Sequence, residues 1–538
     1  MQIAFQATVS GAVPTFLYLS HMRIFPSQKP ISQVIYTFLF LAMATACSEP
    51  AGKIPEYKQD FCSSIHFDTG GGLSKELAPL TDSMRSKTGV YVLEDGEGAM
   101  IARAWLCEHA EKTIDIQYFI FATDNVGLIA CDYIVRAADR GVKVRILIDD
   151  ILVDAGPHDI LTLDAHPNIE IKIYNPGVNL GKNIVTKLAK FATDFKGANQ
   201  RMHNKTFTVD GKVVITGGRN IADEYFDYDH EFNFRDRDVL LLGGVVSNVH
   251  HSFEDFWNND LSMPIDKLVS DEHIDTSVNR FSGLHQYACD TANFWPQVRE
   301  RITHIPEAFQ DIQRSGRLVW TDSVRFVSDI PGKNSVPGMH GGGNTLTALT
   351  DLIKQAQHTI DIQSPYLVVT EEGQALLRDA IERGVHIRVL TNSLSSNDNL
   401  PSFAGYQKIR RKLLESGVRI FEFRPDAKER YTIMTGAYQK KVNYTPVFGL
   451  HAKGMVVDGR IAVIGTFNMD PRSANLNTEC VTIIHSQQVA AGMLRGMEEE
   501  YKPENSWETT LTHNPDAEAA TSRRVKTFVA KVVPRRIL

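Results

Sequence analysis

The stretch HAKGMVVDG at residues 451–459 decides the fold, because the chain carries a close copy of it, HNKTFTVDG, at residues 203–211. Both stretches place a lysine two residues after a histidine and an Asp-Gly pair five residues after the lysine. A pattern that recurs within one chain indicates an internal repeat, and the length of the repeat determines how the rest of the sequence is divided.

Further segments recur in the same order, about 245 residues apart. TIDIQ occurs at residues 113–117 and again at 359–363. RGVKVRILID (140–149) corresponds to RGVHIRVLTN (383–392), and IEIKIYNP corresponds to VRIFEFRP. A chain of 538 residues, 43% hydrophobic and 22% charged, is long enough for two domains with separate cores. The sequence therefore predicts two copies of one domain.

Each copy is predicted to alternate helices with strands, because its apolar residues switch between helical and strand periodicity. The first copy is predicted to contain, in order, a helix over 99–110, a strand over 113–120, a helix over 128–139, strands over 142–148 and 169–174, and two strands joined by Asp210-Gly211. Asp458-Gly459 joins the matching strands of the second copy. This order indicates an α/β protein of two tandem α/β/α domains related by a pseudo-twofold axis. Each domain is expected to be a mixed sheet with helices on both faces.

The repeat and the composition divide the chain into six parts. They are a leader (1–46), an N-terminal lead-in (47–90), the first repeat domain (91–262), a linking insert (263–335), the second repeat domain (336–500) and a basic C-terminal tail (501–538). The end of the tail, RRVKTFVAKVVPRRIL, has six basic residues, no acid and several apolar residues. Such a segment suits an anionic membrane surface, and a disordered solvated end is the alternative.

The amino terminus has the layout of a signal peptide, with a basic start, an apolar middle and small residues at the end. No charge lies between Lys29 and Glu49, and Met22 is an alternative initiator. The ending ATAC, with Cys47 last, resembles a bacterial lipoprotein box, although alanine stands where leucine is usual. We expect export to the bacterial cell envelope and lipidation of Cys47, and an uncleaved anchor helix is the alternative. In both cases the protein is held at a membrane.

Six cysteines occur, at positions 47, 62, 107, 131, 289 and 480. No Cys-x-x-Cys pair or Cys/His cluster has the spacing of a metal site, so we expect neither zinc nor another metal. Cys107, Cys131 and Cys480 lie in apolar periodic stretches, which predicts buried free thiols. The positions give no indication of a disulfide framework.

The candidate functional residues lie in and just after the repeated stretch. They are His203, Lys205, Asp210, Gly218 and Asn220 in the first copy, and His451, Lys453, Asp458, Thr466 and Asn468 in the second. Residues two apart on a strand share a face, so each histidine is expected to lie beside its lysine. The small residues before each asparagine allow backbone and ligand to approach closely.

These residue types predict a phosphate site built from both copies. Lysine is a compact cation that binds phosphate, and asparagine adds neutral donors to the same oxygens. Histidine can act as nucleophile, acid or base near neutral pH. With the copies face to face, one histidine can attack phosphorus while the other protonates the leaving alcohol. Such a site needs no metal and no other cofactor.

Four acids near the motifs each have two interpretations. Asp210 and Asp458 precede turn glycines, so they either form the turn or take part in catalysis. Asp238 and Glu479 stand at the start of matching strands in the two copies. Each is either a surface charge or an acid that orients the histidine of the opposite copy.

The paired signatures HxKx4Dx6GGxN and HxKx4Dx6GTxN resemble those of the phospholipase D superfamily, over nearly all of residues 85–500. Within it the chain is similar to bacterial cardiolipin synthases of class C, through RMHNKTFTVDG, GGRNIADEYF, LTNSLSSND, GYQKIRRKLLESGV and GTFNMDPRSANLNTE. The resemblance implies the same fold, with His203 as the nucleophile that forms a phosphohistidine and His451 as general acid and then base. It also implies transfer between phosphatidylglycerol and phosphatidylethanolamine, giving cardiolipin and ethanolamine. Thr466 stands where serine is commoner, and it keeps the hydroxyl.

Three other functions remain open on the sequence alone. A hydrolytic phospholipase D would share every catalytic residue and release phosphatidic acid. An exported nuclease or other phosphodiesterase is disfavoured by the net charge of −7, since nucleic-acid binders are usually basic, and we expect no nucleic-acid partner. A binding protein with a decayed site is disfavoured because both motifs are intact. The sequence does not identify a partner protein.

Overall fold

A computed structural model describes residues 62, 72–150, 157–177, 199–269, 281–294, 299, 302–333, 341–433 and 446–538. All of them belong to one unit, Ala51–Leu538. The predicted leader, with Cys47 and the alternative start at Met22, lies outside the described residues. Among the helices of the described residues, none is both long enough and apolar enough to cross a membrane.

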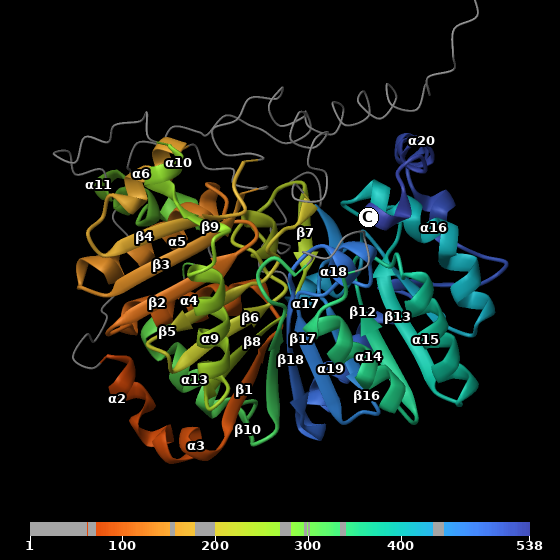
Figure 1. Ribbon diagram of the computed structural model, residues 1–538, viewed down its shortest axis with the longest axis horizontal. Coiled ribbons are helices and arrows are strands. Elements are labelled where there is room, and N and C mark those ends of the chain that lie inside the picture. Colours follow the sequence, from red (N-terminus) through yellow and green to blue (C-terminus); the bar gives the residue numbers. More distant parts are fainter. Residues whose placement is uncertain are drawn as a thin grey trace, which may run out of the picture. The chain divides into compact units, whose positions relative to one another are not determined.

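The first repeat forms a mixed sheet of nine strands within the described residues (Figure 1). In spatial order they are β10 (Val319–Thr321), β1 (Thr88–Leu93), β8 (Asp238–Gly243), β6 (Val213–Gly217), β5 (Thr206–Val209), β2 (Thr113–Tyr118), β3 (Lys143–Asp149), β4 (Ile169–Tyr174) and β9 (Ser262–Pro264). Strands β2, β3 and β4 run parallel, and the other neighbours pair antiparallel.

The second repeat forms a similar mixed sheet, with eight strands in the part of the chain that is described. In spatial order they are β11 (Val324–Ser328), β18 (Cys480–His485), β17 (Ile461–Gly465), β16 (Gly454–Val457), β12 (Thr359–Gln363), β13 (His386–Asn392), β14 (Arg419–Phe423) and β19 (Ser506–Thr509). Here β12, β13 and β14 run parallel, which matches β2, β3 and β4 of the first repeat.

Helices cover both faces of each sheet. In the first repeat α4 (Gly96–His109) and α5 (Asn125–Asp139) share a core with Ile146 and Ile148 of β3, whereas Leu147 packs on the opposite face against α9 (Val246–Trp257). In the second repeat one core includes α14 (Asn344–Gln355), α15 (Glu371–Glu382) and α16 (Leu400–Glu415), and α19 (Gln487–Glu500) packs in another. This alternation confirms the predicted fold class.

Shorter helices complete the described elements. They are α2 (Leu73–Leu77), α3 (Thr81–Ser86), α6 (Pro157–Asp164), α10 (Ile265–Leu268), α11 (Phe281–Ala288), α13 (Ala308–Arg314), α17 (Arg430–Ile433), α18 (Pro471–Asn475) and α20 (Thr521–Ala530), with short 3-10 turns that include η4 (Asp223–Tyr225) and η9 (Arg535–Ile537).

The predicted elements of the first repeat are confirmed, with small differences at helix starts. The predicted strand over 113–120 is β2, and the predicted helices are α4 and α5. Both helices begin three residues earlier than predicted, because an aspartate caps each of them. Asp95 accepts from Gly98 N at 2.5 Å, and Asp124 accepts from Gly127 N at 3.0 Å.

The segments taken as a linking insert and a basic tail also take part in the sheets. β10 joins the edge of the first sheet and β11 the edge of the second, although both lie within the predicted insert. β19 lies within the predicted tail and pairs with β14. The rest of the tail forms α20 and η9, so the described C-terminal end is helical rather than unstructured.

The two repeats are joined by short strands that cross between them. β7 (Phe232–Arg235) of the first repeat pairs parallel with β15 (Val447–Leu450) of the second. A matching bridge links Met202 to Thr478 with the roles of the repeats exchanged. Apolar residues of both sheets form one shared core, including Val214, Leu241 and Ile464. This reciprocal pairing is what a pseudo-twofold relation requires.

One expectation about the cysteines is wrong. Cys62 and Cys289, which are 227 residues apart, form a disulfide. Cysteines this far apart in the sequence form no motif from which a pairing could be predicted, and only the folded chain brings them together. The free thiols Cys107 and Cys480 are buried as predicted, while Cys131 is half-buried.

Candidate active site

Each His-Lys pair lies at the open end of a β-hairpin. His203 and Lys205 immediately precede β5, which pairs antiparallel with β6. His451 and Lys453 precede β16, which pairs in the same way with β17. The asparagine of each motif follows the second strand of its hairpin, so it leaves the sheet at the same end as the histidine and the lysine.

The imidazole of His203 is held by an acid of the second repeat. Its Nδ1 lies 2.8 Å from Glu479 Oε2. Ser473 donates its hydroxyl to Glu479 Oε1 at 2.7 Å, and the Thr466 hydroxyl donates to Oε2. A neutral imidazole that donates through Nδ1 keeps a lone pair on Nε2. Glu479 therefore contacts the histidine of the opposite repeat, as its interpretation as an orienting acid requires.

The imidazole of His451 is held by an acid of the first repeat, but this acid is Asp236. Nδ1 of His451 lies 2.5 Å from Asp236 Oδ2. Asp238, which the sequence suggested for this contact, instead accepts from Arg103 Nη2 at 2.8 Å and lies 3.5 Å from Arg219 Nη1. Asp238 therefore matches neither of its two interpretations, because its side chain is buried and ion-paired with Arg103.

Strand register explains the difference. Gly217 at the end of β6 pairs with Asp238, whereas the equivalent Gly465 of β17 pairs with Val481. Two residues before the paired position stand Asp236 in the first repeat and Glu479 in the second. Asp236 could have been found by counting from the residue that pairs with Gly217, but the sequence alone does not say which residue of β8 that is.

Gly218 and Thr466 make room for these two acids in different ways. A Cβ on Gly218 would lie 2.0 Å from Asp236 Oδ1, so only glycine fits beside that carboxylate. In the second repeat Thr466 occupies the equivalent place, and its hydroxyl binds the longer Glu479 side chain. In the first repeat no hydroxyl binds the acid, and the shorter Asp236 side chain packs directly against Gly218 instead.

Both lysines are buried beside the histidines. Lys205 Nζ donates to His203 O at 2.9 Å, and Lys453 Nζ lies 3.0 Å from His451 Nε2. Burial lowers the pKa of Lys205 to about 7 and that of Lys453 to about 8, against the opposing effect of the buried acids. Two ammonium groups held in this way favour an anionic ligand between the repeats.

Both histidines are neutral near pH 7. Burial lowers the pKa of His203 to about 4 and that of His451 to about 3, and the neighbouring lysines act in the same direction. Although burial alone would raise the pKa of Asp236 and Glu479, their contacts with the histidines and lysines hold both below the usual range. The site is therefore set for neutral imidazoles paired with ionised carboxylates.

The two asparagines differ in their contacts. Asn220 accepts from Ile120 N through Oδ1 at 3.1 Å. The buried Asn468 donates its backbone N–H to Ser473 Oγ at 3.1 Å, and its side-chain Oδ1 has no hydrogen-bond partner among the described residues. A buried polar group without a partner is costly, so this oxygen, an acceptor, is open to a group that donates a hydrogen bond.

Asp210 and Asp458 lie at the far ends of the hairpins from the histidines. They have positive φ angles of 52° and 51°, which aspartate tolerates better than most residues. The Asp210 carboxylate accepts three backbone N–H groups of residues 111–113, at 2.7–2.9 Å. Asp458 accepts those of residues 357–359 in the same way. Their placement corrects the catalytic assignment and favours the turn-forming one.

Aromatic side chains that the sequence analysis did not single out pack around both histidines. Phe119 makes an edge contact with the His203 ring at 4.9 Å between centroids. Tyr225 and Phe234 contact the His451 ring at 5.0 and 4.8 Å. Ring contacts of this kind help to hold each imidazole in its orientation. Phe234 belongs to β7, so the strand pairing between the repeats also positions this ring against His451.

Within the described residues, one cluster of side chains that could bind a metal occurs, and it contains none of the residues of the two His-Lys motifs. It contains Cys62, His285 and Cys289. The two cysteines are joined as a disulfide, and disulfide sulfurs are not the thiolates that bind metals. The cluster is therefore part of a covalent link in this structure.

The two mixed sheets and the reciprocal half-sites define a phospholipase D-like protein. A family model described as the phospholipase D-like domain of cardiolipin synthase matches residues 106–257 and 349–500. Cardiolipin synthase C of Escherichia coli (strain K12) is 35% identical over 430 residues, which cover 78% of this chain and 86% of that protein. Cardiolipin synthase 1 of Bacillus anthracis is 25% identical over 468 residues, covering 86% and 73%.

Among solved structures, the crystal structure of phosphatidylserine synthase from Haemophilus influenzae Rd KW20 shares the fold. Its TM-score is 0.54 at 14% identity, and the match covers 86% of this chain and 100% of that chain. The chain belongs to the cardiolipin synthase family of phospholipase D-like proteins, and it is an enzyme of the phospholipase D type.

Proposed function

We propose that this protein is a membrane-associated phosphatidyltransferase that makes cardiolipin from phosphatidylglycerol and phosphatidylethanolamine through a phosphohistidine. One observation carries the proposal: each repeat supplies a histidine, a lysine and the acid that holds the other repeat's histidine. Such a site is complete only when both halves meet around one phosphate. The named relatives in two bacteria are cardiolipin synthases.

In the first step, Nε2 of His203 attacks the phosphorus of phosphatidylethanolamine, and the phosphorus–oxygen bond to ethanolamine breaks. His451 gives the leaving oxygen a proton. The charge of the bound phosphodiester offsets the two lysines, which raises the pKa of His451 from its low value in the empty site. Lys205, Lys453 and the side-chain N–H groups of Asn468 stabilise the non-bridging oxygens. The choice of His203 as nucleophile follows the family resemblance.

In the second step, the acceptor is the headgroup hydroxyl of phosphatidylglycerol. His451, now neutral, takes the hydroxyl proton as the oxygen attacks phosphorus, and the bond between phosphorus and His203 breaks. Cardiolipin leaves, and both histidines are again in the state they had when the first substrate was bound, with the proton on His451. Two displacements at one phosphorus need one nucleophile and one proton carrier, which the two half-sites supply.

Transfer to a lipid alcohol is favoured over hydrolysis by the closure of the site. His203 and His451 are only 6% and 5% exposed, and aromatic rings contact both imidazoles. Exclusion of water protects a phosphohistidine until an alcohol arrives with its lipid. A hydrolytic phospholipase D would need water at the same buried position.

We place the protein in the bacterial cell envelope, lipid-anchored at Cys47. The disulfide between Cys62 and Cys289 supports export, because disulfides persist in oxidising compartments and are rare in the reducing cytosol. An enzyme held at a membrane has direct access to both lipid substrates.

The experiment that tests the reaction is mass spectrometry of lipid products from the detergent-purified full chain. The protein is given phosphatidylglycerol alone, phosphatidylethanolamine alone, and both together. We expect cardiolipin chiefly from the mixture, with ethanolamine released. Phosphatidic acid from single lipids without cardiolipin would instead establish a hydrolase on the same two half-sites.

The two-histidine scheme has its own test. His203→Ala and His451→Ala are each expected to abolish turnover, because neither half-site can complete both displacements alone. Trapping of a protein that carries a phosphatidyl group in the His451→Ala variant, and not in the His203→Ala variant, would assign the nucleophile. Full activity in either variant would exclude the scheme.

A further inference from the structure

The C-terminal helix α20 is amphipathic, but its large apolar residues lie on the exposed face and not on the buried one. Its large apolar residues Val525, Phe528, Val529 and the following Val532 are spaced as i, i+3, i+4 and i+7, which is the pattern of a core-facing stripe. All four side chains are exposed, and Phe528 is 71% exposed. The small residues Thr527 and Ala530 are the ones buried against the body of the protein.

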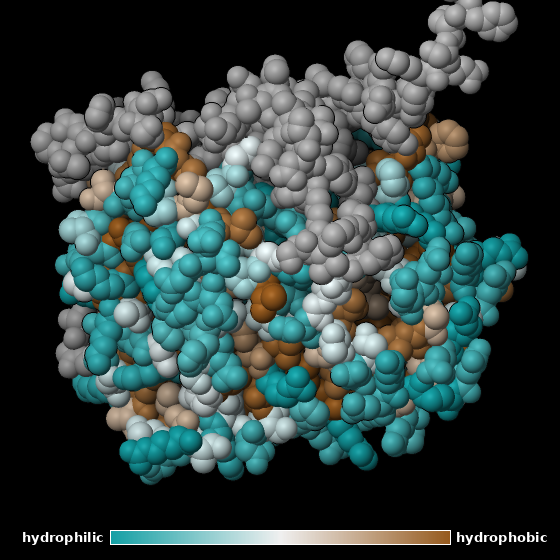
Figure 2. Space-filling model, viewed as in Figure 1, coloured by the Kyte–Doolittle hydropathy of each residue, from teal (hydrophilic) through white to brown (hydrophobic). Residues whose placement is uncertain are grey.

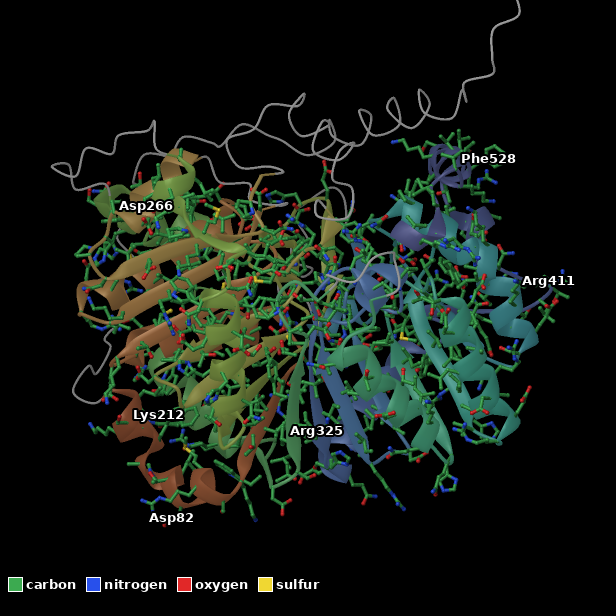
Figure 3. All side chains as sticks on the ribbon, in the orientation of Figure 1. Asp82, Lys212, Asp266, Arg325, Arg411 and Phe528 are labelled. Carbon is green, nitrogen blue, oxygen red and sulfur yellow. A yellow bond between two sulfur atoms is a disulfide. The ribbon has the colours of Figure 1, made fainter. Side chains whose placement is uncertain are left out.

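This apolar stripe is visible on the surface. Figure 2 shows hydrophobic side chains at the position of α20 in Figure 1, and Figure 3 labels Phe528 on the outer side of the helix. Four of the eight large apolar side chains that are exposed among the described residues belong to the stripe. A concentration of this kind marks a binding surface, because single exposed apolar residues are normally scattered.

Basic residues surround the stripe. Arg524, Lys526, Lys531 and Arg536 are exposed, and residues 521–538 contain no acid. Nζ of Lys531 lies 5.8 Å from the Phe528 ring centroid. Two acids near this region are paired, Asp516 with Arg410 and Glu371 with Arg535, and Glu518 lies exposed three residues before α20. An apolar stripe bordered by cations fits the interface of an anionic bilayer better than a protein surface.

The helix is braced against segments that lead to the candidate active site. Arg523 Nε donates to Leu394 O at 3.0 Å, and Lys408 Nζ donates to Lys531 O at 2.6 Å. The final carbonyl, Leu538 O, accepts from the backbone N of Arg472 in α18 at 3.1 Å. The next residue of α18, Ser473, donates to Glu479, the acid that holds His203. A series of direct contacts therefore links the C-terminal end that follows α20 to the candidate active site.

We propose that α20 is an interfacial helix that inserts Val525, Phe528, Val529 and Val532 into an anionic bilayer and holds the active site next to its lipid substrates. The inference rests on the proposed function only for the identity of the substrate, since insertion itself needs no catalysis. It differs from an anchor at the amino terminus, because it sets the orientation of the body of the enzyme.

Insertion is tested by fluorescence of the full chain bound to vesicles of phosphatidylglycerol and phosphatidylethanolamine. Phe528→Trp is compared with Leu511→Trp, which replaces an apolar residue that is 54% exposed but lies outside α20. Relative to the parent protein, we expect a blue shift and at least twofold quenching by brominated lipid for Phe528→Trp and neither for Leu511→Trp. A Phe528→Trp variant whose added indole stays unquenched while the protein is vesicle-bound would overturn the proposal.

A second experiment separates this inference from the proposed function. Phe528→Glu is expected to lower turnover on vesicles at least tenfold while leaving turnover of monomeric short-chain lipid unchanged, with Leu511→Glu unchanged on both. Equal loss on both substrates would contradict an interfacial role. Failure to make cardiolipin would leave the quenching result standing. If Phe528→Glu dissolves a dimer without changing vesicle binding, the stripe is a protein interface and the proposal is wrong.

Discussion

In the proposed mechanism, a single carboxylate selects the tautomer of each histidine. Asp236 Oδ2 lies 2.5 Å from His451 Nδ1, and Glu479 Oε2 lies 2.8 Å from His203 Nδ1. Both acids are fully buried, so their charge acts in a medium that screens it weakly. The reacting Nε2 atoms depend on these contacts although the acids do not touch the substrate.

Asp236→Asn is expected to lower kcat on the order of 10³-fold, because an amide can offer an N–H to Nδ1 and stabilise the wrong tautomer. Asp210→Asn is the control, since its carboxylate binds only backbone N–H groups at the turn. It should keep kcat and lose about 1–2 kcal/mol of unfolding free energy. Kinetics and urea unfolding measure both. Similar kcat values for the two variants would refute the assigned role of Asp236.

The lysines predict an alkaline limit on activity. The pKa of Lys205 is lowered to about 7 and that of Lys453 to about 8, so their ammonium groups are present below these values and are lost as pH rises through them. We expect kcat/KM to fall above pH 7–8, since it reports the free enzyme. On the acid side the histidines stay neutral down to about pH 4.

Lys453→Arg provides the control for this pH dependence. A guanidinium keeps its charge at every pH in the range, so the fall in kcat/KM near pH 8 should disappear even if kcat/KM is lower at every pH. A pH profile that is the same in this variant and in the parent protein would show that Lys453 does not set the limit.

At the scale of elements, the β-hairpin is the unit that builds each half-site. The Asp-Gly turn closes one end, and the histidine, lysine and asparagine leave from the other. The hairpin of the first repeat also presents Gly218 to an acid on the segment before β8. This close approach depends on the missing Cβ, since a methyl group would lie 2.0 Å from Asp236 Oδ1.

Gly218→Ala is expected to displace the Asp236 carboxylate and to lower kcat about 100-fold, as small misplacements in active sites do. Gly492→Ala is the matched control, because the nearest atom to its new Cβ would be Arg495 Nη2 at 3.9 Å. Steady-state kinetics and a thermal unfolding curve for each variant give the answer. Unchanged turnover in Gly218→Ala would show that the carboxylate can move without cost.

For the whole molecule, the site depends on the way the repeats exchange residues. The backbone N of His203 donates to Thr478 O at 3.0 Å, and that of His451 donates to Arg235 O at 2.8 Å. Buried ion pairs such as Arg235 with Glu500 span the same interface. Breaking such a pair leaves an uncompensated charge, which favours one arrangement of the two halves.

The disulfide between Cys62 and Cys289 is expected to stabilise the whole fold. It closes a loop of 227 residues, for which loop entropy in the unfolded chain gives up to about 5 kcal/mol. A reductant should therefore lower the Tm of the parent protein and leave that of Cys62→Ser unchanged. Thermal unfolding with and without reductant tests this, and equal numbers of reactive thiols in the oxidised and the reduced protein would contradict it.

The sequence by itself determined the repeat, the α/β class, the helices and strands of the first domain and the two His-Lys pairs. These features depend on periodicity and turn chemistry within a few residues, which the unfolded chain already carries. The starts of α4 and α5 differed by three residues because Asp95 and Asp124 act as caps.

Only the tertiary structure decided that Asp236 and not Asp238 contacts His451, that Cys62 meets Cys289, and that the apolar stripe of α20 faces outward. Asp236 and Asp238 are two residues apart, so they differ in role only through the register of β6 against β8. Register, disulfide pairing and the burial of one helix face depend on contacts between segments far apart in the chain. Such contacts are set by packing, and a local pattern carries no record of them.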